Sequence, residues 1–115
     1  TNLEPTEEEL KRGLEESFSQ VKEKPIKIQV THVPPHLTKI DLISAGLHVG
    51  SKVVREFIEE KQPNLAVCGH IHEARGVDWI KNTLIINPGR LSEGYVGIIE
   101  IKEDGKVEGK VINVL

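Results

Sequence analysis

The segment from Val67 to Glu73, Val-Cys-Gly-His-Ile-His-Glu, constrains the fold more than any other part of this sequence. It begins inside a short apolar run, residues 65–68, that predicts a buried strand. His70 and His72 lie two residues apart, and side chains at that spacing project to the same side of an extended backbone. Gly69 is expected to let the chain turn sharply, so that both imidazoles leave the strand end and converge.

A third histidine, His32, follows a second apolar strand, predicted over residues 26–31, in the same way. Two strands that both end in histidines indicate neighbouring parallel strands, which bring their ligands to one edge of an open α/β sheet. Neutral imidazole nitrogen is a good ligand for zinc, manganese, iron, nickel and cobalt. The pattern therefore predicts a metal site built from His32, His70 and His72.

The remaining periodicity predicts two helices before the histidine segment and four strands after it. Apolar residues at helical spacing predict a helix over residues 6–22, in which Thr6 and Glu9 form a capping box, and Ser51 is expected to cap a second helix that ends near Gln62. The loop between them, residues 33–50, is long enough to be functional or disordered. Short strands are predicted at residues 77–80, 83–87, 94–102 and 106–114, with hairpin turns at Lys81-Asn82 and Asp104-Gly105.

Charge and composition exclude several classes of protein. The net charge of −3 and the pI near 5.9 argue against a long nucleic acid as partner. No apolar run reaches the roughly 20 residues that span a bilayer, so no membrane partner is expected. The single cysteine, Cys68, excludes an internal disulfide, suits a cytoplasmic location, and is interpreted as a buried strand residue and not as a ligand.

Three motifs, taken in order, resemble the C-terminal motifs of the calcineurin-like metallophosphoesterases, above all the small prokaryotic and archaeal members. They are Thr31-His32-Val33-Pro34-Pro35, Gly69-His70-Ile71-His72 and Asn87-Pro88-Gly89. The resemblance covers roughly residues 26–102 and implies an α/β chain that forms the C-terminal half of an α/β/β/α sandwich, with two helices, parallel strands and then antiparallel strands. The Asn87-Pro88-Gly89 element is interpreted as a turn that shapes the wall of the site.

The Asp-x-His, Gly-Asp and Gly-Asn-His motifs of the family's N-terminal half are not found in this sequence, which also contains no methionine. We therefore expect residues 1–115 to be the C-terminal portion of such a domain, with the N-terminal half absent. Removal of half a sandwich exposes sheet edges, so the missing half or a second copy of the chain is the expected protein partner.

The resemblance implies a metal-dependent phosphoesterase, which hydrolyses small phosphomono- or phosphodiesters with a hydroxide that bridges two divalent ions (manganese, zinc, iron or nickel). It assigns His32 and His70 to one ion and His72 to the other. The histidine that assists catalysis belongs to the absent half, so no catalytic residue is expected here. Three histidines divided between two ions predict weak or single-metal binding and negligible catalysis by this chain alone.

Two further side chains are candidates for contact with a substrate phosphate. His48 precedes the predicted N-terminus of the second helix, a place that suits anions, and Arg75 can donate two parallel hydrogen bonds to a phosphate. Pairing of Arg75 with Glu73 or Asp78 is the favoured alternative, and His36 is interpreted as an exposed turn residue.

Other interpretations remain for the whole chain. It could be a catalytically inactive binding module on the same scaffold, as in the retromer subunit with this fold, or a fragment without independent function. The three histidines together argue against an inactive scaffold, which has no chemical need for them. A metallo-β-lactamase-like site, a cupin and a zinc finger each fit the spacing of potential ligands poorly.

Overall fold

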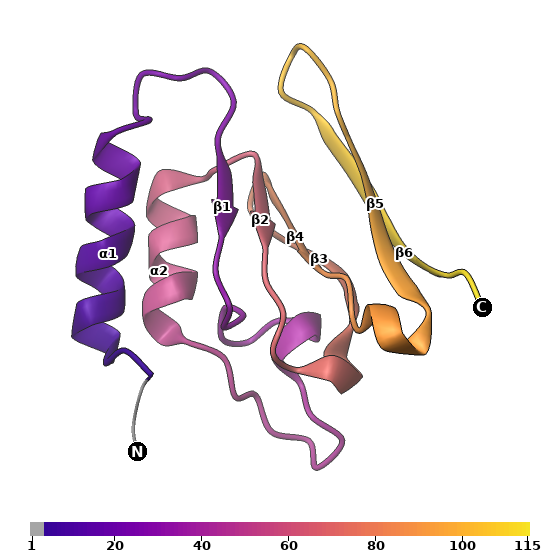
Figure 1. The fold of residues 1–115 in the computed structure, drawn as a ribbon. Coiled ribbons are helices and arrows are strands. Elements are labelled where there is room, and N and C mark those ends of the chain that lie inside the picture. The colour runs from indigo at the N-terminus through magenta and orange to yellow at the C-terminus, as the bar shows by residue number, and fades with distance from the viewer. Residues whose placement is uncertain (1–3) are drawn as a thin grey trace.

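The computed structural model describes residues 4–115, which form three layers (Figure 1). Two helices cover one face of a four-stranded sheet, and a two-stranded hairpin covers the other. The helices are α1 (Glu7–Ser19) and α2 (Lys52–Lys61), and the sheet contains β1 (Ile28–Val30), β2 (Leu65–Val67), β3 (Gly76–Ile80) and β4 (Thr83–Asn87). The hairpin consists of β5 (Tyr95–Ile101) and β6 (Val107–Asn113), and three short 3-10 helices, η1 (Lys39–Asp41), η2 (His72–Ala74) and η3 (Leu91–Glu93), lie in the loops.

The sheet has the strand order β1-β2-β4-β3. β1, β2 and β4 run parallel, with Val30 opposite Val67 and Val67 opposite Ile86, whereas β3 is antiparallel to β4. The carboxyl ends of the three parallel strands therefore meet at one edge. The predicted mixed architecture of two helices, parallel strands and then antiparallel strands is confirmed.

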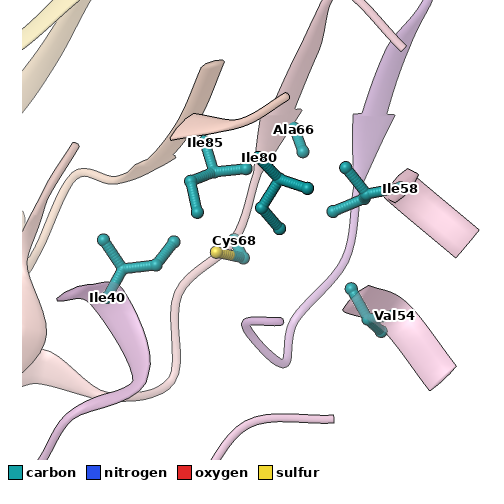
Figure 2. Close-up of a cluster of buried hydrophobic side chains, with 7 residues drawn as sticks. All are labelled: Ile40, Val54, Ile58, Ala66, Cys68, Ile80 and Ile85. Atoms are coloured by element: carbon teal, nitrogen blue, oxygen red, sulfur yellow. The ribbon is translucent and has the colours of Figure 1, made fainter. Parts of the chain in front are cut away.

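The two hydrophobic clusters explain why the strands read as continuous apolar runs. In β2 and β4, Ala66 and Ile85 face the helices, while Leu65, Leu84 and Ile86 face the hairpin. A strand buried on both faces shows no polar alternation. Figure 2 shows the cluster on the helix side, which consists of Ile40, Val54, Ile58, Ala66, Cys68, Ile80 and Ile85.

The predicted helix boundaries are close to those observed. Thr6 and Glu9 form the expected capping box, with the Thr6 amide donating to Glu9 Oε1 (2.9 Å) and the Glu9 amide donating to Thr6 Oγ1 (3.1 Å). Helix α1 ends at Ser19, earlier than expected, because the Gln20 and Val21 amides bond to the carbonyls three residues before them and close a tighter turn. Among residues 4–115, no helix is long and apolar enough to cross a membrane.

The long loop of residues 33–50 is ordered and packs into the core. Ile40 and Asp41, both in η1, are completely buried. Arg55 of α2 donates to the carbonyl oxygens of His36 and Leu37, which attaches the loop to the helix layer. The loop is therefore part of the packed structure.

Candidate metal centre

The imidazoles of His32 and His70 meet at the carboxyl edge of the parallel sheet. His32 Nε2 lies 2.9 Å from His70 Nδ1, and the ring centroids are 4.6 Å apart. The Gly69 amide donates to the His32 carbonyl (3.0 Å), so a backbone hydrogen bond joins the ends of the two strands that carry the histidines. The structure thus brings His32 and His70 together, but among residues 4–115 it shows no group that joins His72 to them as predicted.

The sharp turn of the histidine segment involves both Gly69 and His70. His70 has a φ of +66°, whereas Gly69 is not among the residues with positive φ, so the turn is centred on His70 and begins at Gly69. A left-handed conformation costs a non-glycine residue about 1–2 kcal/mol. The Ile71 amide donates to the Gly69 carbonyl (2.7 Å) and helps to hold this turn. Strain of this kind is typical of functional sites.

The pair of imidazole nitrogens fits one metal ion. Imidazole nitrogens are common ligands of divalent transition metals, and at 2.9 Å the two nitrogens are close enough that one ion would be held by both. His72 is the first residue of η2, and both His70 and His72 are exposed. Across residues 4–115, no group of three or more His, Cys, Asp or Glu side chains forms a complete site. Within residues 4–115 the structure therefore shows one close pair of imidazoles, His32 and His70, and this pair alone is an incomplete donor set for a metal ion.

The polar centre of the 33–50 loop is Asp41, a residue that sequence reasoning did not select. Its completely buried carboxylate accepts hydrogen bonds from the amides of Leu37 (3.1 Å), Thr38 (2.9 Å) and Gly50 (2.9 Å) and from His48 Nδ1 (2.6 Å). Burial alone raises the pKa of Asp41, but these hydrogen bonds and the charge of His48 outweigh it, so the pKa lies below its ordinary value. The Thr38-x-x-Asp41 spacing, a helix-capping pattern, was the available signal.

His48 is held by this carboxylate, and the N-terminus of α2 is occupied by other groups. The Ser51 hydroxyl accepts the Val54 amide (3.1 Å) and donates to the Glu7 carboxylate at the start of α1 (2.8 Å to Oε2). His48 remains about 31% exposed, with its Nδ1 directed at Asp41. Its contact with a substrate remains a prediction.

Arg75 stacks on Tyr95 and pairs with neither expected carboxylate. Its guanidinium carbon lies 3.9 Å from the Tyr95 ring centroid, Nη2 donates to Tyr95 Oη (2.8 Å), and Nη1 lies 3.4 Å from the His72 carbonyl. The favoured pairing with Glu73 or Asp78 is wrong, because Glu73 accepts the Ser44 amide and Asp78 accepts the Lys39 amide. Tyr95 was missed, although it is the only tyrosine of the chain and follows the Asn-Pro-Gly turn closely.

The family model described as metallophosphoesterase, calcineurin superfamily, matches residues 14–111. This chain belongs to that family. It is 44% identical over 63 residues to the uncharacterized protein MJ1162 of Methanocaldococcus jannaschii, a match that covers 51% of this chain and 29% of the relative. The chain thus spans less than a third of the length of that curated relative.

Two solved structures share the fold of this metallophosphoesterase chain. The first superposes with a TM-score of 0.68 at 25% identity. The superposition covers 90% of this chain and 39% of the chain in that structure. The second, TT1561 of Thermus thermophilus, superposes with a TM-score of 0.54 at 22% identity. The superposition covers 87% of this chain and 39% of the TT1561 chain, and it supports the fold alone. Metallophosphoesterases normally bind divalent metals, in agreement with the exposed imidazole pair.

Proposed function

We propose that this chain supplies part of the active site of a metal-dependent phosphoesterase that hydrolyses small phosphomono- or phosphodiesters. The observation that carries the proposal is the 2.9 Å approach of His32 Nε2 and His70 Nδ1 at the carboxyl edge of the sheet, in a chain of the metallophosphoesterase family. In this proposal His32 and His70 hold one divalent ion and His72 holds a second. Such ions, when bound, supply a hydroxide nucleophile and neutralise charge on the phosphoryl oxygens.

Arg75 supports the proposal as a contact for a substrate phosphate. Its guanidinium is exposed, is oriented by stacking on Tyr95, and forms no ion pair with a carboxylate among residues 4–115. It also borders His72 through the His72 carbonyl. A planar cation held in this way retains N–H groups for two phosphate oxygens. His48, oriented by Asp41, is the second and more distant candidate.

The open edge of the sheet supports the proposal that the remaining ligands come from outside this chain. Within residues 4–115, β1 pairs with β2 alone, and the Ile28 and Val30 side chains are 53% and 74% exposed. The Gln29 side chain, on the opposite face of β1, is buried, and its amide group finds no hydrogen-bond partner among the described residues. We propose that a strand of the N-terminal half covers this edge, and that in its absence a second copy competes for it.

Metal titrations of single-histidine variants test the ligand assignment. We expect His32→Ala and His70→Ala to abolish binding of the same ion in calorimetric titrations with Mn²⁺ or Zn²⁺, because each removes one of the two proposed ligands of that ion. His72→Ala is expected to leave that ion bound. His36→Ala is the matched control, since His36 belongs to the 33–50 loop and is expected to leave binding unchanged. Unaltered metal uptake by His32→Ala and His70→Ala would remove the basis of the assignment.

Activity is expected only when the whole domain is present. Release of p-nitrophenol from p-nitrophenyl phosphate and its diester should be absent for this chain and present for the longer protein. In the longer protein, His70→Ala combined with His72→Ala should abolish both metal content and turnover. Metal uptake without hydrolysis of any phosphoester by the longer protein would favour the inactive scaffold instead.

Edge pairing has its own test. We expect the isolated chain to self-associate in sedimentation experiments and Val30→Lys to reduce this association, because a lysine on an open strand edge opposes pairing. Lys110→Arg on β6 keeps the charge of the hairpin and is the control. A wild-type chain that sediments as a soluble monomer and binds no hydrophobic dye would contradict the proposed edge.

A further inference from the structure

Asn87 is a buried polar residue at the carboxyl end of β4, beside the histidine loop. Its side chain is only 1% exposed and makes two hydrogen bonds. The amide nitrogen Nδ2 donates to the Ile71 carbonyl (2.7 Å), and the oxygen Oδ1 accepts the Gly89 amide (3.1 Å). One side chain therefore links the end of the central sheet to two separate loops.

The carbonyl that Asn87 holds lies between the two histidines of the Gly-His-x-His segment. It belongs to the peptide bond that joins Ile71 to His72, and it also accepts the Ala74 amide (3.0 Å), which closes the turn of η2. On the other side of Ile71 is His70, in its left-handed conformation. This single peptide group therefore lies between His70 and His72 and is held by two donors.

We propose that Asn87 is a positioning residue for the metal ligands and that its Nδ2 donor separates the site of His72 from the site of the His32–His70 pair. This inference rests on the proposed function. The purely structural alternative is that Asn87 only shapes the Asn-Pro-Gly turn. That role requires nothing beyond an acceptor for the Gly89 amide, and an aspartate supplies an acceptor equally well.

Replacement by aspartate separates the two roles. Asn87→Asp is isosteric and keeps the oxygen that accepts the Gly89 amide, but an ionised carboxylate cannot donate to the Ile71 carbonyl and repels it. In the longer protein, we expect Zn²⁺ affinity at pH 8 to fall at least tenfold at the site assigned to His72, as is typical when a partner that orients a metal ligand is lost. We also expect changed amide shifts of Ile71 and His72 in the metal-free chain, while the Gly89 amide shift is retained.

Asn82→Ala is the matched control, because Asn82 lies at the opposite end of the same β3–β4 hairpin and its side chain is exposed. It should leave Zn²⁺ affinity and the histidine shifts unchanged. Wild-type affinity and unchanged His72 shifts in Asn87→Asp overturn the positioning role. Failure of the longer wild-type protein to bind Zn²⁺ overturns the ligand assignment instead, and the metal-free shifts of this chain then decide the role of Asn87 independently.

A measurement on the unaltered chain covers the case in which Asn87→Asp does not fold. The side-chain amide protons of Asn87 should exchange with solvent much more slowly than those of Asn82, because they are buried and donated to a carbonyl. They should also shift when Zn²⁺ is added. Exchange as fast as that of Asn82, without a shift on metal addition, overturns the proposal.

Discussion

Replacement of Asp41 by asparagine should destabilise the chain strongly although it changes almost no volume. The carboxylate is 0% exposed, and each of its oxygens accepts two hydrogen bonds. Oδ1 accepts the Thr38 amide and His48 Nδ1, while Oδ2 accepts the amides of Leu37 and Gly50. An asparagine has only one oxygen, so in either orientation its NH2 group replaces an acceptor of two hydrogen bonds.

The magnitude follows from the donors that lose their partner. A hydrogen bond to a charged group contributes about 1.5–3 kcal/mol, and a buried donor without a partner costs about 1–3 kcal/mol. His48 can change tautomer and accept from the new amide, which limits the loss on its side of the carboxylate. We therefore expect Asp41→Asn to lower the free energy of unfolding by about 3 kcal/mol.

Urea unfolding followed by circular dichroism at pH 7 measures this loss. With a slope of about 1–3 kcal/mol per molar urea, the midpoint should fall by about 1–3 M. Asp104→Asn is the control: Asp104 is exposed, its side chain accepts the Lys106 amide in a hairpin turn, and asparagine suits that turn. A change below about 0.5 kcal/mol in Asp41→Asn, as expected for the control, would refute the reasoning.

The same variant has a defined pH dependence. Because the folded pKa of Asp41 lies below its ordinary value of 3.8, the ionised carboxylate stabilises the fold above that pH. This contribution is lost as the pH falls below 3.8 through the folded pKa. The difference in stability between wild type and Asp41→Asn should therefore shrink below about pH 4. A difference that persists unchanged to pH 3 would contradict the assigned pKa direction.

Three further outcomes are expected. Gly50→Ala should lower the melting temperature, because its Cβ would lie 2.5 Å from the Pro34 carbonyl oxygen and displace the loop that follows His32. Gly13→Ala should instead raise the melting temperature slightly, since Gly13 lies inside α1 with nothing within 4 Å of the added carbon; equal effects of the two changes would contradict the packing argument. Cys68 should resist iodoacetamide at pH 8 until the chain unfolds, because burial raises its thiol pKa to about 12; rapid labelling of the folded chain, detected by intact mass, would refute this.

The elements that follow from short-range pattern were predictable from the sequence. The capping box of Thr6 and Glu9, the apolar runs of β2 and β4, and the placement of His32 and His70 after parallel strands all depend on residue types at fixed local spacing. The family motifs added the order of the elements along the chain and the metal chemistry. The close approach of His32 and His70 is the structural counterpart of that local information.

The partners of the polar side chains were decided only by tertiary structure. Glu73 accepts a hydrogen bond from the amide of Ser44, 29 residues away, and Asp78 accepts one from the amide of Lys39, 39 residues away. Arg75 donates to the Tyr95 hydroxyl instead. Sequence spacing predicts which side chains share a strand or helix face, but not which loops the sheet brings together. The strand ends and the placement of histidines after them were therefore predictable from the sequence itself. The long-range hydrogen bonds between the loops depend on how the layers pack.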